Sequence, residues 1–325
     1  MADSPLKPRI REGKVSIGTH QLYLSIHGPH RMPGEPTIVI IPGLMCSMKQ
    51  WAAVRRLLEE EKKSVPFLLY ERSGHNESED SPNPPTAVNI ASELNALLKA
   101  AEVEPPYVLV CHSYGGIISR EFIHLKQTNG EDGDISGIVF VDANQEKNIQ
   151  LWPNPEFGPD IWKGIDYLEA VTKDLRALTA EEWKDMTEAH STERSQRTQA
   201  AELKSYPGSV RALADRKQLG REPPLLGSRP VSVLRGDTLR DERLLYNLGV
   251  AAGNGTEEQR AMYRKKLETF KELDVSFQRE HLLLSTNSHF VQTKNGGHNV
   301  HLQEPMLIVE EIGWVLQELD KAKAQ

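Results

Sequence analysis

Four short apolar runs divide the first half of the chain. They cover residues 37–41, 65–70, 107–111 and 137–141. Continuous apolar runs of this length between turn residues are typical of strands that are buried on both faces. The pattern therefore predicts the inner strands of a parallel sheet.

Amphipathic segments separate and follow these runs. Residues 47–61, 86–101 and 116–126 carry apolar side chains at helical spacing, and residues 306–321 repeat the pattern near the C-terminus. Residues 14–28 read as a polar–apolar hairpin ahead of the first run. Strands that alternate with helices predict an α/β fold, a mostly parallel, twisted sheet with helices on both faces.

The alternation breaks between Asn144 and Gly227. Apolar density is low there, and polar helical patterns at 179–190 and 193–205 lie among loops that contain Trp and Pro. We therefore expect a mainly helical cap, inserted after the sixth strand. The expected domains are a first core part, the cap and a second core part, at residues 14–143, 144–227 and 228–325.

Strand patterns return at residues 231–234 and 288–291. The segment between them, about 240–285, is longer than one crossover helix needs. It contains a charged amphipathic helix pattern at 257–272. Two interpretations stay open. The segment either adds to the cap or to a partner surface, or it is an extended solvated helix.

Composition and charge exclude several classes of protein. The 325 residues carry a formal net charge of −7 and a pI of about 5.9, whereas a nucleic-acid-binding domain needs a basic face. Residues 1–13 lack the apolar run of a signal peptide, and no stretch approaches the roughly 20 apolar residues of a membrane span. Cys46 and Cys111 do not make a disulfide framework. We expect a cytoplasmic protein without nucleic-acid or membrane partners.

The strongest chemical signal is the sequence VLVCHSYGG at residues 108–116. A strand pattern ends at Ser113, and Gly115, Gly116 and a helical pattern follow. The pattern G-x-S-x-G holds a nucleophilic serine at a tight strand-to-helix turn in this way. Cys111 replaces the first glycine with another small residue. The alternative is a buried strand and a glycine-rich turn whose serine has no chemistry.

A serine hydroxyl needs a general base, and His298 is the predicted one. It follows the last predicted strand in a glycine-rich loop, and it comes after the serine in the chain. Ten other histidines compete for this role. We expect His112 to point away from the serine, His75 to be structural, and His301 to be structural or to line the site.

The acid that orients the base has two candidates. Asp142 directly ends the strand at 138–141, and Asp237 follows the strand at 231–234 and Gly236. The chain order serine, acid, histidine suits either residue. We favour Asp142 because side chains at a strand end project into the site, whereas Asp237 also fits the cap of a turn.

Backbone N–H groups should stabilise the oxyanion. We expect one donor from Tyr114, the residue after the serine, and another from Leu44 in the loop at 42–46. Leu44 is chosen because Gly43 permits the sharp turn before it.

With these pieces in order, the chain resembles the α/β-hydrolase superfamily. The resemblance rests on five motifs: IIPG at 40–43, YERSGHNES at 70–78, HSYGG at 112–116, VFVDA at 139–143 and GHNVHL at 297–302. It looks most like fungal and bacterial members whose sixth strand ends in V-D-A or V-D-P. The resemblance implies the α/β-hydrolase fold and a Ser-Asp-His triad.

Some members of this superfamily bear on the choice of acid and nucleophile. Certain haloalkane dehalogenases and zearalenone-type lactone hydrolases take the acid from the sixth-strand position, which supports Asp142 over Asp237. Haloalkane dehalogenases use an aspartate nucleophile, and Ser113 argues against that chemistry. This chain departs from the family pattern at three positions, where Cys111, Pro42 and Glu71 replace a glycine, a histidine and an aspartate.

Together these residues predict a serine hydrolase that cleaves a carboxylic ester or lactone of a small, largely apolar substrate. The same triad serves C–C bond hydrolysis, thioester hydrolysis and cyclisation steps of secondary metabolism, and the fold does not separate these reactions. A non-catalytic small-molecule-binding protein is a third hypothesis.

No metal or organic cofactor is expected, because the histidines show no metal-ligand spacing with acidic residues. No long apolar face lacks an intramolecular partner, so the sequence indicates no oligomer. Aromatic residues of the cap either line a substrate pocket or hold the cap on the core. They are Trp152, Phe157, Trp162, Tyr167 and Trp183.

Overall fold

The computed structural model describes residues 11–60, 65–151 and 160–324. Its centre is an eight-stranded sheet with the strand order β1-β2-β4-β3-β5-β6-β7-β8. The first two strands and the β2–β4 pair are antiparallel, and all other neighbours are parallel. This sheet confirms the predicted α/β fold class. The strands are β1 (Glu12–Ser16), β2 (Gln21–His27), β3 (Thr37–Ile41), β4 (Phe67–Tyr70), β5 (Tyr107–His112), β6 (Ile135–Val141), β7 (Val231–Arg235) and β8 (Ser288–Gln292).

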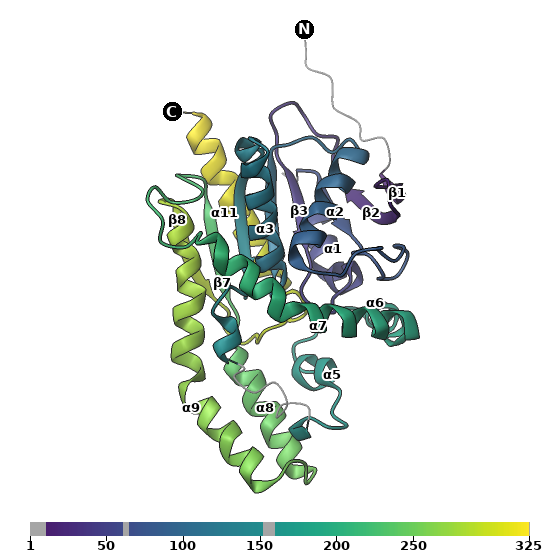
Figure 1. Ribbon diagram of the computed structural model, residues 1–325, viewed down its shortest axis with the longest axis vertical. Helices are drawn as coiled ribbons and strands as arrows, with labels where there is room; N and C mark the ends of the chain where they lie inside the picture. Colours follow the sequence, from purple (N-terminus) through teal and green to yellow (C-terminus); the bar gives the residue numbers. More distant parts are fainter. Residues whose placement is uncertain (1–10, 61–64, 152–159, 325) are drawn as a thin grey trace.

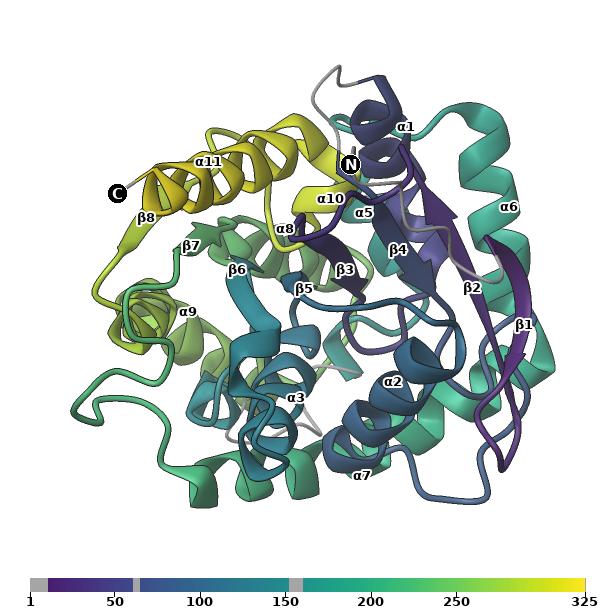
Figure 2. The same cartoon turned by 90° about the horizontal axis from the view of Figure 1, so that it is seen from above.

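The inner strands are continuous apolar runs because the sheet is covered on both faces. Alternate side chains of β3 enter two separate cores, with Val39 and Ile41 in one and Ile38 and Ile40 in the other. Helices α2 (Ala87–Ala100) and α3 (Gly115–Thr128) cover the first face. Helices α1 (Ala52–Glu60) and α11 (Pro305–Lys323) cover the opposite face (Figure 2).

The described part of the segment between β6 and β7 is made of helices joined by turns and loops. It contains α5 (Tyr167–Thr172), α6 (Ala180–Ser191) and α7 (Glu193–Arg216), after a short 3-10 turn at Asn148–Leu151. Helix α7 crosses below α3 at the end of the sheet where α5 and α6 also lie (Figure 1). It runs on past the predicted end at residue 205 and contains Pro207.

The segment between β7 and β8 folds as two helices, α8 (Thr238–Ala251) and α9 (Glu257–Glu280). The prediction gave a shorter helix for α9 and no helix for α8. The side-chain amide of Asn254 donates to the carbonyl of Ile161 at 3.0 Å, and the Trp162 indole donates to the Tyr263 hydroxyl at 3.1 Å. This segment therefore contacts the residues inserted after β6. No helix in the described ranges has the length and apolar character that crossing a membrane requires.

Candidate active site

Ser113 lies at a left-handed turn between β5 and α3. Its φ of 53° is a conformation that few non-glycine residues adopt. The turn is held by its backbone, since the N–H of Ser113 donates to the Val141 carbonyl at 3.3 Å and the Ser113 carbonyl accepts from Asn144 at 2.8 Å. A strained turn of this kind presents a nucleophile at the end of the sheet.

The glycines of this turn are required by close backbone contacts. A Cβ atom at Gly115 would lie 2.3 Å from the carbonyl oxygen of Ile41, and one at Gly116 would lie 2.7 Å from that of Asn144. A Cβ atom at Gly43 would lie 3.0 Å from the Cβ of Ser113. These glycines therefore let β3, the residues that follow β6 and the loop after β3 approach the serine.

His298 and Asp142 form a hydrogen-bonded pair. Nδ1 of His298 donates to Oδ2 of Asp142 at 2.6 Å, and Asp142 follows β6 as predicted. The same carboxylate accepts from the Gly236 N–H at 2.9 Å and from the Thr238 hydroxyl at 2.7 Å. In the described structure no hydrogen bond joins Ser113 Oγ to Nε2 of His298, and this contact is often loose in an unliganded site.

Asp237, the other predicted acid, lies at the start of α8 and its side chain is 45% exposed. Its nearest cationic partner is Arg235, at 3.8 Å. The structure brings Asp142, not Asp237, to the imidazole of His298. Both aspartates follow a strand, but the 2% exposed Asp142 faces the loop that carries the histidine.

Three carboxylates determine the charge around His298. Burial lowers the pKa of His298, but the hydrogen bond and charge of Asp142, with the charges of Asp241 and Asp274, raise it above its ordinary value. Oδ2 of Asp241 accepts from the backbone N–H of His298 at 2.8 Å. Burial raises the pKa of Asp241 to about 6. The surroundings thus favour an imidazolium at this position, as a general base requires once it has taken a proton.

His112 lies beside the predicted base, His298. Its ring centroid is 4.7 Å from that of His298, and its Nε2 donates to the His298 carbonyl at 2.9 Å. The His298 loop passes beside the end of β5, which brings the two rings together. Burial lowers the pKa of His112 well below its ordinary value, so this ring stays neutral. His301 is fully buried and stacks on Trp51 at 5.0 Å.

The predicted oxyanion donors lie in two loops around the serine. Leu44 belongs to the loop after β3, and Tyr114 is the N-cap of α3. In the loop after β3, the N–H of Met45 donates to Glu202 and that of Cys46 to the Gly43 carbonyl. Among the described residues, no hydrogen bond uses the N–H of Leu44 or Tyr114, which leaves both groups available to a ligand.

Other residues near the candidate triad were not identified from the sequence. Asp241, Thr238 and Glu202 all contact the site or its loops through hydrogen bonds. Asp241 and Thr238 lie close in the sequence to Asp237, one of the two predicted acids, and this proximity was the only sequence feature that pointed to them. Glu202 lies in a polar helix pattern and carried no signal of its own.

The aromatic residues predicted for the cap have different surroundings. The Tyr167 hydroxyl accepts from the side chain of Asn299, next to the predicted base, at 3.0 Å. Trp162 stacks on Tyr167 with a centroid distance of 6.4 Å. Trp183 packs under the Arg176 guanidinium at 3.5 Å. Two others, Trp152 and Phe157, lie outside the described residues.

The two cysteines are free thiols in the structure. Within the described ranges, no group of three or more His, Cys, Asp or Glu side chains is placed to hold a metal ion.

Comparison with known proteins identifies the family. The Alpha/beta hydrolase family matches residues 38–311. An "AB hydrolase superfamily protein" of Gibberella zeae is 34% identical over 323 residues, which cover 93% of this chain and 94% of that protein. The chain belongs to the alpha/beta hydrolase family, which confirms the resemblance noted in the sequence.

Other matches are a longer sequence relative and two solved structures that share the fold. A Hormonema carpetanum protein named "Probable transporter efuK" is 29% identical over 97% of this chain, which spans 44% of that protein. The crystal structure of the esterase RhEst1 from Rhodococcus sp. ECU1013 is 18% identical, with a TM-score of 0.56 over 95% of this chain and 100% of that one. The epoxide hydrolase CorEH is 12% identical, with a TM-score of 0.59 over 95% and 99%.

Proposed function

We propose that this protein is a serine hydrolase that cleaves a carboxylic ester or lactone of a small, largely apolar substrate. In this proposal Ser113 is the nucleophile, His298 the general base and Asp142 the acid that orients it. The observation that carries the proposal is the 2.6 Å hydrogen bond between His298 Nδ1 and Asp142 Oδ2, together with a serine held at a left-handed turn.

The reaction follows from these positions. Nε2 of His298 takes the proton as Ser113 Oγ attacks the carbonyl carbon, and Asp142 stabilises the imidazolium. The N–H groups of Leu44 and Tyr114 donate to the oxyanion of the tetrahedral intermediate. His298 then returns the proton to the leaving alcohol, and an acyl-enzyme remains on Ser113. A water molecule, deprotonated by His298, releases the carboxylic acid and restores the serine.

A fluorophosphonate probe tests the nucleophile without knowledge of the substrate, because it phosphonylates activated serines. We expect labelling of the wild-type protein, none of Ser113→Ala, and wild-type labelling of Ser119→Ala. Ser119 is a matched control because it is a buried serine in α3. A wild-type protein that stays unlabelled, at a concentration that labels a control esterase, would refute the proposal.

A second measurement is needed to identify the type of bond that is cleaved. Hydrolysis of p-nitrophenyl butyrate and of a medium-chain lactone, each lost in Ser113→Ala, would support ester or lactone cleavage. Probe labelling without hydrolysis of either compound would instead favour a thioester or C–C bond as the target of the same triad.

A further inference from the structure

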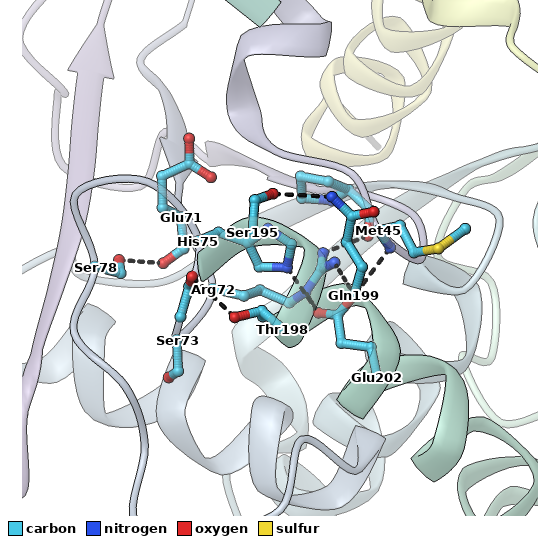
Figure 3. A network of polar contacts seen from close by, with 12 residues as sticks. Met45, Glu71, Arg72, Ser73, His75, Ser78, Ser195, Thr198, Gln199 and Glu202 are labelled. Carbon is cyan, nitrogen blue, oxygen red and sulfur yellow. Dashed lines mark hydrogen bonds and ion pairs between the residues drawn. The ribbon is translucent and has the colours of Figure 1, made fainter. Parts of the chain in front are cut away.

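A buried ion pair joins α7 to the turn that follows β4, and both of its members hydrogen-bond to the loop that follows β3. Glu202 of α7 is fully buried, and its carboxylate accepts from Arg72 Nε at 2.7 Å and Nη2 at 3.0 Å. His75 Nε2 donates to the same carboxylate at 3.1 Å. The Met45 N–H does so at 2.9 Å. Figure 3 shows Arg72, His75 and Met45 around Glu202.

The pair holds both peptide groups that flank Leu44. Arg72 Nη2 donates to the Gly43 carbonyl at 2.8 Å, and that oxygen belongs to the same peptide group as the Leu44 N–H. On the other side of Leu44, the next peptide N–H, that of Met45, donates to Glu202. A trans peptide group points its N–H away from its carbonyl. Fixing the Gly43 carbonyl on Arg72 therefore directs the Leu44 N–H away from the ion pair.

The charge of Arg72 also affects the donor strength of this peptide group. A hydrogen bond to a carbonyl oxygen polarises the peptide and strengthens its N–H as a donor. Arg72 Nη1 donates to the Pro42 carbonyl at 3.0 Å, so one guanidinium serves two consecutive carbonyls of the loop. Burial raises the pKa of Glu202, but Arg72 and His75 outweigh burial and lower it well below its ordinary value. The carboxylate is therefore ionised throughout the neutral pH range.

We propose that Glu202 is a positioning residue, which acts through Arg72 and Met45 to aim the Leu44 N–H at the oxyanion. This inference rests on the proposed function, in which Leu44 is an oxyanion donor. It assigns the cap a part in the chemical step, because Glu202 belongs to the cap and Arg72 to the core. A second contact of α7 agrees with it, since Ser209 hydrogen-bonds to the hydroxyl of Tyr114 at 2.9 Å.

The substitution Glu202→Gln tests this role. The donors around Glu202 are shared between its two carboxylate oxygens, whereas glutamine offers them a single acceptor oxygen. We expect the maximal rate of labelling by the fluorophosphonate, and kcat for p-nitrophenyl butyrate, to fall about 10- to 100-fold. KI and KM should stay within a factor of two or so, because the interaction matters in the transition state only. The pH midpoint of kcat/KM should not move, since Glu202 does not contact His298.

Glu121→Gln is the matched control for loss of cap docking. Arg216 of α7 pairs with the 2% exposed Glu121 of α3 at 3.1 Å, away from the loop after β3. This variant should keep the wild-type labelling rate. An equal loss of rate in Glu121→Gln and Glu202→Gln would overturn the proposal, because it would show a general effect of docking the cap.

The double variant Arg72→Leu/Glu202→Leu separates positioning from stability. Replacing both members of a buried ion pair with apolar side chains often preserves stability. We expect its melting temperature to recover relative to Glu202→Gln while the labelling rate stays low. Recovery of the rate with the stability, or a wild-type rate in Glu202→Gln, would refute the positioning role. An unlabelled wild-type protein would instead refute the proposed function itself.

Discussion

The carboxylate of Asp142 contacts His298, whereas that of Asp237 does not. Substitution of the two residues should therefore have different effects on activity. Asp142→Asn should lower kcat for p-nitrophenyl butyrate by about 10³- to 10⁴-fold, because an amide no longer fixes the tautomer of His298 or stabilises its charge. Asp237→Asn should change kcat less than about threefold, as expected of a largely exposed side chain without a contact to the base. The opposite ranking of these variants would make Asp237 the acid.

The acidic surroundings of His298 predict the pH dependence of the reaction. In the proposed reaction His298 must be neutral in the free enzyme, and the pKa of His298 is raised. The acid limb of kcat/KM should therefore have its midpoint above the ordinary histidine pKa of about 6.5. Asp241→Asn removes a negative charge that contacts the His298 backbone and should shift the midpoint to lower pH.

The control for this shift is Asp237→Asn, which should leave the midpoint unchanged. A midpoint in Asp241→Asn that equals the wild-type value, measured over pH 5 to about 9, would show that Asp241 does not influence the base.

At the scale of elements, the β5–α3 turn depends on a close approach to β3. Gly115→Ala would force a Cβ to 2.3 Å from the Ile41 carbonyl, so either the turn or β3 must move. We expect a loss of about 3 kcal/mol in the free energy of unfolding. Gly313→Ala in α11 is the contrasting substitution, because no atom lies within 4 Å of its Cβ. It should stabilise the protein by about 0.5–1 kcal/mol. Urea unfolding monitored by circular dichroism measures both, and equal effects would contradict the steric argument.

Helix α7 shows why some elements could not be predicted in full. The predicted helix ended at residue 205, shortly before Pro207 and Gly208. Proline inside a helix costs about 3 kcal/mol. The helix continues to Arg216 because Val210 and Leu213 are buried against the core. Periodicity alone does not contain these tertiary contacts. The inner strands were predictable because their apolar runs reflect burial on both faces.

On the scale of the whole molecule, the two segments that follow β6 and β7 meet at Ile161. The carbonyl of Ile161 accepts from Asn254, and its oxygen would lie 2.2 Å from a Cβ at Gly249. Asn254→Ala should loosen this contact and increase tryptic cleavage after the exposed Lys163, whose carbonyl Asn254 also binds.

Limited proteolysis with mass spectrometry measures the rate of this cleavage. The exposed Asn129, beyond the C-terminal end of α3, provides the control substitution Asn129→Ala. A cleavage rate at Lys163 that is the same in the wild type and Asn254→Ala would show that the contact does not hold the two segments together.

The residues of the candidate site were easier to propose from the sequence than the residues that hold its loops in place. Ser113, His298 and Asp142 could be proposed because each follows a recognisable strand pattern or glycine-rich loop. The contacts of Glu202 and Arg72 could not, because they join residues 130 positions apart and depend on how a polar helix lies across the core. Chain order carries no information about such a contact.

The ion pair between Arg72 and Glu202 also limits how this protein can be recombined. A chimera that kept this core but took the residues between β6 and β7 from another protein would bury Arg72 without its carboxylate, unless the donor segment supplied one at the same place. An unpaired buried charge costs several kcal/mol. An exchange of this segment to obtain new substrate preferences must therefore keep a glutamate at the position of Glu202, although the rest of the segment comes from the other protein.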